Sequence, residues 1–417
     1  MMSSSLNGFS GIIKDSSYLT ASNIIIFIIS AVSYPIIGRL YSDVAFATFA
    51  IFQSLLILLQ NVPNLGLNEA LLLCKNSVFR NIIKPVYIFS IATILVILPF
   101  LFIINSYVIN KSYNFVIALA IAIIVASLNL TFITALLRTS KFKIMSTLKV
   151  FEKSVFTLLA LTFGLAKLYH FGLILGMLVS QISIQIAGLS FIRRYLKAPS
   201  GLFTLQSFVK KYRAFPKYSL PSSFIERLSS QLPILMLPTL VGNAITGQYA
   251  MAWKILAIPE LLFAVSLSHT FYKRASELYR AKRNIHVLLI QTWKAQAVLG
   301  IFPLIISILF GPKLFIMVLG LNWASSGEIA QIIAISVFLS FISVPTSSVF
   351  SILGKQHYGL YFSLLLLGVR FIALFYGLEF FHFESAIWIM VLSEAIIIIL
   401  YNYLSFTRVM RWQKSML

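Results

Sequence analysis

The chain has 417 residues, of which 59% are hydrophobic and only 11% are charged, and its mean hydropathy is +0.94. Soluble domains carry roughly 25% charged residues and cannot bury this much apolar surface, so the composition excludes a water-soluble fold. The net charge of +22 comes from 33 basic and 11 acidic residues. In a membrane protein such an excess is explained by basic loops on one side of the bilayer, and we predict no nucleic-acid binding.

Apolar segments long enough to cross a membrane recur along the whole chain. A helix needs about 20 apolar residues to span the hydrocarbon core. Twelve segments meet this length, at residues 18–38, 43–65, 84–106, 114–136, 147–168, 171–192, 218–241, 246–271, 286–309, 326–352, 357–379 and 386–407. The sequence therefore predicts an all-α polytopic membrane protein with about 12 transmembrane helices. We expect a six-helix N-terminal lobe at 1–192, a basic cytoplasmic linker at 193–217 and a six-helix C-terminal lobe at 218–417.

The basic residues also predict the orientation of the chain. If the N-terminus is cytoplasmic, 24 of the 33 Lys and Arg residues fall in cytoplasmic segments, four fall on the opposite side and five lie within spans. Cytoplasmic loops are enriched in Lys and Arg, so we expect both termini in the cytoplasm. The two halves also share a weak repeat, FATFA at 46–50 and TGQYA at 246–250, which predicts pseudo-symmetric lobes of the kind found in transporters.

Motifs for catalysis or for metal and nucleotide binding are missing from the sequence. It contains no H-E-x-x-H, no phosphate-binding G-x-x-x-x-G-K-[ST] and no G-x-S-x-G, and it has a single cysteine. The five histidines are scattered, without the spacing of metal ligands. We therefore predict no enzyme activity, no catalytic residue, no metal site and no cofactor.

Nine charged residues lie well inside the predicted spans, at least five residues from either end, and they are the candidates for function. Each costs at least about 2.5–3.5 kcal/mol at the centre of a spanning helix, so each needs a partner or a water-filled cavity. The basic ones are Arg227, Lys254, Arg370, Lys153 and Lys294, and the acidic ones are Glu152, Glu226, Glu260 and Glu394. We interpret the basic set as the lining of a cationic cavity for an anionic substrate, because guanidinium and ammonium groups bind phosphate oxygens.

Two further observations bear on this interpretation. Helix neighbours such as Glu226 and Arg227 point about 100° apart, so they do not pair with each other. The alternative to a substrate site is therefore a salt bridge between helices, with Glu260 or Glu394 bonded to a base elsewhere. The segment 218–241 contains three prolines together with serine pairs at 222–223 and 229–230, which predicts a broken helix that borders protein or a cavity.

Several blocks of the sequence together resemble the Wzx-type polysaccharide flippases. They keep the family's order and cover most of the chain: GRLYS at 38–42, FATFA at 46–50, FPKYSLPSS at 215–223, LSSQLPIL at 228–235, GQYAMA at 247–252, WASSGEIA at 323–330 and SSVFSILG at 347–354. The resemblance implies the multidrug/oligosaccharidyl-lipid/polysaccharide exporter superfamily, with two six-helix lobes around a central cavity. The family has no short invariant catalytic motif, so the resemblance assigns no catalytic residue to this chain.

The resemblance also implies a function. Wzx-type proteins move undecaprenyl-pyrophosphate-linked repeat units from the cytoplasmic to the periplasmic leaflet of the bacterial inner membrane, for O-antigen and other surface polysaccharides. Membrane lipids and a polysaccharide polymerase are then the expected partners. Glu226, Glu260 and Glu394 are candidates for coupling to protons or sodium ions. Two alternatives stay open: a multidrug exporter of the same fold, and a membrane glycan polymerase or ligase. The sequence does not identify the sugars carried.

Overall fold

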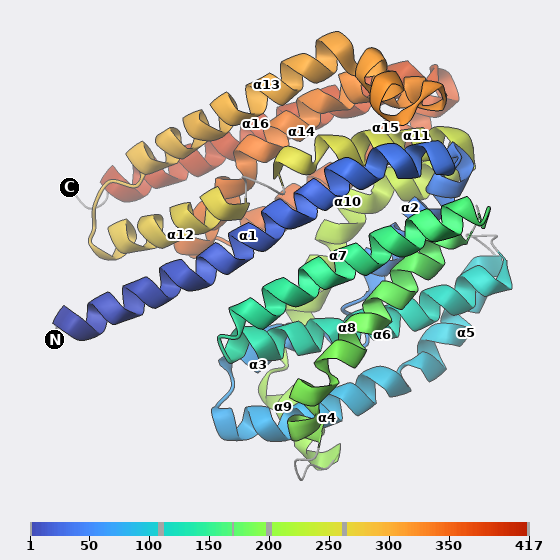
Figure 1. Ribbon diagram of the computed structural model, residues 1–417. Coiled ribbons are helices and arrows are strands. Elements are labelled where there is room, and N and C mark those ends of the chain that lie inside the picture. Colours follow the sequence, from blue (N-terminus) through green and yellow to red (C-terminus); the bar gives the residue numbers. More distant parts are fainter. Residues whose placement is uncertain (1, 107–111, 169–170, 197–201, 261–264, 415–417) are drawn as a thin grey trace. The chain divides into compact units, whose positions relative to one another are not determined.

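The computed structural model describes residues 2–106, 112–168, 171–196, 202–260 and 265–414, and throughout these ranges it is helical without strands (Figure 1). The helices are α1 (Met2–Leu40), α2 (Asp43–Leu59), α3 (Asn68–Leu73), α4 (Asn76–Ala92), α5 (Ile94–Ile104), α6 (Tyr113–Arg138), α7 (Phe142–Leu165), α8 (Gly172–Leu196), α9 (Leu202–Lys211), α10 (Leu220–Leu240), α11 (Asn243–Leu256), α12 (Val265–Arg280), α13 (His286–Leu319), α14 (Ala324–Ile352), α15 (His357–Phe380) and α16 (Phe383–Lys414). A π-helical turn at Phe215–Ser219 and a 3₁₀ turn at Leu321–Trp323 complete them. The predicted all-α membrane fold is confirmed.

Each of the twelve predicted spans falls on one or two of these helices. Within the described residues, seven helices are long and apolar enough to cross a membrane, and two shorter apolar helices lie at Asp43–Leu59 and Gly172–Gly188. The predicted spans outside these nine lie on α7, α10, α11 and α12. Most of the charged residues that we singled out, including Lys153, Arg227 and Lys254, lie on these less apolar helices.

The chain forms two compact units. Unit 1 comprises Met1–Ser33 and Ile51–Phe224, and unit 2 comprises Tyr34–Ala50 and Ile225–Leu417. The bounds of these units differ from those of the expected lobes in two places. Tyr34–Ala50, the end of α1 and the start of α2, belongs to unit 2, and residues 193–224, the linker and the start of α10, belong to unit 1.

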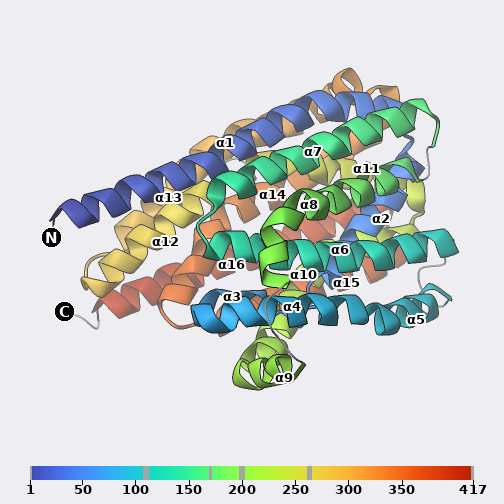
Figure 2. The same ribbon diagram turned by 60° about the horizontal axis from the view of Figure 1, so that its bottom comes forward.

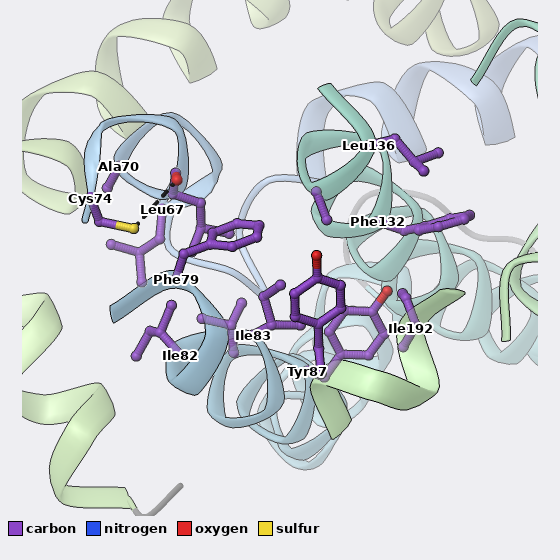
Figure 3. Close-up of a cluster of buried hydrophobic side chains, with 14 of the residues drawn as sticks. Leu67, Ala70, Cys74, Phe79, Ile82, Ile83, Tyr87, Phe132, Leu136 and Ile192 are labelled. Atoms are coloured by element: carbon purple, nitrogen blue, oxygen red, sulfur yellow. Dashed lines mark hydrogen bonds between the residues drawn. The ribbon is translucent and has the colours of Figure 1, made fainter. Parts of the chain in front are cut away.

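Unit 1 is organised around α6, which packs against α3, α4, α5, α7 and α8. Figure 3 shows a core cluster of this unit, in which Phe79 and Ile83 of α4 point toward Phe132 of α6 and Ile192 of α8. All four side chains are almost completely buried. The linker, expected only as a basic segment, contains the helix α9, which packs against α4 through Leu205 and Phe208 (Figure 2).

Unit 2 is organised around α14, which packs against α11, α12, α13 and α16 (Figure 1). Close contact between helices is possible because small residues meet at the interfaces. A Cβ atom on Gly327 of α14 would lie 2.4 Å from the Cα of Pro312 in α13, so only glycine fits there. In the eighth predicted span α11 ends at Leu256 with a turn at Ala257, and residues 261–264 of this span lie outside the described residues.

Candidate functional site

The best-defined polar feature of unit 2 is an ion pair between two residues predicted for different roles. Arg370 of α15 donates through Nε to Oε1 of Glu394 on α16, at 2.6 Å. The two residues are only 6% and 1% exposed. The hydroxyl of Ser336 on α14 donates to the other carboxylate oxygen of Glu394. The structure therefore shows a salt bridge between helices for Arg370 and Glu394. This is the alternative to a substrate site that the sequence left open.

A third helix joins the network through its backbone. Nη1 of Arg370 donates to the carbonyl oxygen of Ser229 in α10. In a regular helix this carbonyl would accept from the N–H of residue 233, but that residue is proline and has no N–H. Arg370 thus supplies the donor that Pro233 lacks. This geometry favours a structural role for the pair, while substrate binding by Arg370 and ion coupling by Glu394 stay predictions.

Lys254 of α11 has aromatic surroundings. Its Nζ atom lies 4.8 Å from the ring centroid of Phe49, 5.2 Å from that of Phe46 and 5.8 Å from that of Tyr34. Distances below about 6 Å are typical of cation–π interactions. The rings stabilise the ammonium through their negative faces, and Lys254 itself is only half-buried.

The rings beneath Lys254 are held rigidly within unit 2. Phe46 and Phe49 are almost fully buried, and their rings meet edge to face at 6.1 Å. Phe46 makes a second edge-to-face contact, at 5.7 Å, with Trp323. The indole Nε1 of Trp323 donates to the carbonyl of Gly38 at 2.6 Å. The sequence blocks at 38–42, 46–50 and 323–330 therefore converge on one platform, which we call the aromatic platform: Tyr34, Phe46, Phe49 and Trp323.

The other predicted cations have different surroundings. Arg227 is half-buried on α10, next to the exposed Glu226. Lys294 is exposed on α13. Lys153 lies in unit 1 on α7, with Nζ 5.4 Å from the ring of Phe156.

Glu260 follows the end of α11 and lines a small cavity of unit 2. The cavity has a volume of about 30 Å³, and Pro259, Gly300 and Phe341 are among its other lining residues. That volume is sufficient for one or two water molecules. A carboxylate in such apolar surroundings is costly unless it binds a proton or a cation, and ion coupling by Glu260 stays a prediction.

No group of three or more His, Cys, Asp or Glu side chains within the described ranges could hold a metal ion. Sequence reasoning missed the contributions of Ser229 and Ser336. The signal for Ser229 was present, since a proline four residues later removes its helical hydrogen bond. The position of Ser336 opposite Glu394 depends on how three helices pack.

Comparison with known proteins places these features in context. Residues 12–279 match the family model described as polysaccharide biosynthesis protein. The teichuronic acid biosynthesis protein TuaB of Bacillus subtilis (strain 168) is 22% identical over 382 residues, which are 89% of this chain and 76% of that protein.

Solved structures of membrane transporters share the fold. The lipid II flippase MurJ, in an inward closed conformation, has a TM-score of 0.73 at 13% identity, with 95% of this chain and 90% of that chain covered. A MOP superfamily transporter from Pyrococcus furiosus Vc1, noted for the reverse polarity of its binding pocket, has a TM-score of 0.66 at 13% identity over 96% of both chains. An inward-facing multidrug resistance transporter has a TM-score of 0.64 at 14% identity over 95% of both chains.

Proposed function

The chain belongs to the polysaccharide biosynthesis protein family, and from this membership we propose that it is a flippase for a lipid-linked polysaccharide precursor. The relatives and structural neighbours are transport and polysaccharide-synthesis proteins, which supports the proposal that this chain is a transporter rather than an enzyme. The proposed substrate is an undecaprenyl-pyrophosphate-linked oligosaccharide repeat unit, moved to the periplasmic leaflet for O-antigen or surface polysaccharide synthesis. A polysaccharide polymerase would consume the product.

The observation that carries the choice of an anionic substrate is the position of Lys254 on the aromatic platform. Three rings lie within 5.8 Å of the cationic ammonium and hold it at a defined place in the spans, on a side chain that is half-buried. A diphosphate is the part of a lipid-linked glycan that such a charge would attract. Arg227, half-buried on α10, is the proposed second cation.

The proposed direction agrees with the electrical gradient across an inner membrane. An inside-negative potential favours outward movement of a negative head group by about 2.3 kcal/mol per charge per 100 mV. The orientation with both termini in the cytoplasm is part of the proposal and is supported by the 24-to-4 distribution of basic residues. A reporter enzyme that is active only in the periplasm, fused to the C-terminus, should be inactive.

The test of function uses charge removal at Lys254. In a strain that lacks the chromosomal gene, Lys254→Met should lower surface polysaccharide at least tenfold and cause single lipid-linked units to accumulate on the cytoplasmic leaflet. Lys254→Arg should retain export. Lys313→Met removes an exposed charge from α13 and serves as the matched control. Protein levels are measured for every variant.

Three results would contradict the proposal in different ways. Normal export by Lys254→Met would remove the proposed site. Single units that reach the outer leaflet but are not polymerised in the deletion strain would indicate a polymerase. Unchanged polysaccharide together with a loss of drug resistance in that strain would indicate a multidrug exporter.

A further inference from the structure

A larger cavity, partly lined by polar side chains, lies in unit 1 between α4 and α9. Its volume is about 310 Å³, and it is lined by Ser77, Val78 and Asn81 of α4 and by Ser207, Phe208 and Lys211 of α9. The candidate span Ser77–Ile103 begins at this cavity, so the cavity lies where a spanning helix meets the membrane surface. Figure 2 shows α9 alongside α4. We call this cavity the α4–α9 pocket.

The wall formed by α9 is anchored. Leu205 and Phe208 are buried in the core of unit 1, and the rings of Phe208 and Tyr212 pack at a centroid distance of 4.7 Å. The opposite side of α9 exposes Ser207 and Lys211. A short helix with one apolar side in a core and one basic side at a membrane surface is an amphipathic interfacial helix.

Charge around the pocket is of one sign. Neither of the segments that form it, 75–84 and 202–217, contains an Asp or a Glu residue. Exposed basic side chains flank the lining residues in both segments, namely Lys75, Arg80, Lys210 and Arg213. A concave surface with basic surroundings attracts anions and concentrates them.

The lining combines the groups that a phosphodiester needs. The hydroxyls of Ser77 and Ser207, the side-chain amide of Asn81 and the ammonium of Lys211 can donate to phosphate oxygens. The half-buried Val78, with the buried Phe208 behind it, provides an apolar surface beside them for the first acyl-chain carbons of a lipid. Such a mixture at the end of a span fits a lipid head group better than a free anion, which needs no apolar contact.

We propose that the α4–α9 pocket binds the phosphodiester head group of an anionic phospholipid, such as phosphatidylglycerol, in the leaflet that faces the basic loops. Lys211 is the charged contact, and the two serines and Asn81 orient the phosphate. The bound lipid is a resident of the pocket and is not transported. This inference is independent of the proposed flippase activity, because it concerns residues of unit 1 that the transport proposal does not use.

Binding can be measured on the full-length protein without a transport assay. The purified chain in neutral detergent is titrated with phosphatidylglycerol and, separately, with phosphatidylcholine, and bound lipid is counted by native mass spectrometry. We expect preferential retention of phosphatidylglycerol. Lys211→Gln should weaken its binding about fivefold, as expected for one basic contact to an anionic head group. Ser207→Trp, which fills the pocket from its exposed rim, should abolish the preference.

The matched control is Lys143→Gln, which removes an exposed charge from the same unit at a residue that does not line the pocket. It should change binding less than twofold. Equal losses in Lys143→Gln and Lys211→Gln would overturn the proposal in favour of a diffuse basic surface. Displacement of phosphatidylglycerol by equimolar undecaprenyl diphosphate would assign the pocket to the transported lipid, and displacement by millimolar inorganic phosphate would assign it to a soluble anion. Either result would also overturn the proposal.

Discussion

Arg370 donates a hydrogen bond to the backbone carbonyl oxygen of Ser229, and that oxygen has no helical donor because position 233 is proline. The same guanidinium pairs with Glu394, so one side chain ties α10, α15 and α16 together. A carbonyl left unpaired in the hydrocarbon region is costly, which explains why a buried charge is retained there.

Loss of Arg370 should therefore destabilise unit 2 in two separable ways. Arg370→Leu leaves Glu394 buried without its base and should lower the free energy of unfolding by about 3–5 kcal/mol. Adding Pro233→Ala restores a backbone donor for Ser229 and should recover about 1 kcal/mol. Thermal unfolding of the purified variants in detergent measures both effects. If Pro233→Ala is equally stabilising with Arg370 present, the two residues do not share the carbonyl.

A second proline–carbonyl relationship predicts the role of Gln331. Pro312 of α13 leaves the carbonyl of Ile308 without a helical donor, and Nε2 of Gln331 on α14 donates to it at 2.6 Å. Gln331→Leu should lower stability by about 1 kcal/mol in the wild-type background and by less when combined with Pro312→Ala. Equal costs in both backgrounds would show that Gln331 acts through other contacts.

Glycine requirements differ sharply between two positions in unit 2. A Cβ atom on Gly247 of α11 would lie 2.0 Å from the backbone oxygen of Asp43, whereas one on Gly368 of α15 would meet nothing within 4 Å. Gly247→Ala should abolish stable expression, and Gly368→Ala should be neutral or stabilise by roughly 0.5–1 kcal/mol. Fluorescent-tag size-exclusion chromatography of membrane extracts distinguishes the two. Normal recovery of Gly247→Ala would contradict the close approach of α11 to the start of α2.

Cys74 offers a specific probe because it is the only cysteine in the chain. It is buried beside α3, and the guanidinium of Arg138 donates to the carbonyls of Leu71, Leu72 and Cys74 at the end of that helix. Burial raises the pKa of the Cys74 thiol, an effect that the charge of Arg138 opposes in part. The thiolate is the reactive form, so the rate of alkylation should be slow at neutral pH. As the pH is raised, this rate should continue to increase at pH values where the rate for an exposed cysteine is already constant.

Removal of the cap should expose this thiol. We expect Arg138→Ala to increase the rate of maleimide labelling at least tenfold, because the final carbonyls of α3 lose their donor and the helix end frays. Lys143→Ala, at an exposed position in the same unit, should leave the rate unchanged. Equal labelling of wild type and Arg138→Ala would mean that α3 does not depend on this contact.

Proton coupling, if it operates, should depend on Glu260. Glu260→Gln removes the titratable group from the cavity of about 30 Å³, so glycan export should no longer respond to dissipation of the pH gradient. Glu277→Gln, at an exposed position on α12, is the control and should respond as wild type does. If export by Glu260→Gln still responds fully to dissipation of the pH gradient, Glu260 is not the coupling residue. The remaining candidates would then be Glu226 and Glu394, or export is coupled to none of these carboxylates.

Hydropathy alone locates most of the helices, because a spanning helix needs a long apolar segment and a soluble fold cannot bury so many of them. It does not locate the turn at Ala257 that ends α11, because the sequence stays largely apolar there. Nor does it reveal α9, whose ten residues are too short and too basic to register as a span. The partners of the charges require tertiary contacts: Arg370 and Glu394 are 24 residues apart on different helices. The sequence alone leaves two alternatives for these charges, a substrate site and a salt bridge between helices, and only the packing of the helices shows the salt bridge.

The assignment of Tyr34–Ala50 to unit 2 has a consequence for dissecting the protein. The polypeptide passes between the units after Ser33, after Ala50 and after Phe224, so neither half of the gene encodes a self-contained unit. A C-terminal fragment that begins at the linker would lack the rings under Lys254 and the carbonyl that accepts from Trp323. Co-production of an N-terminal and a C-terminal fragment should restore function only if the N-terminal fragment contains Tyr34–Ala50.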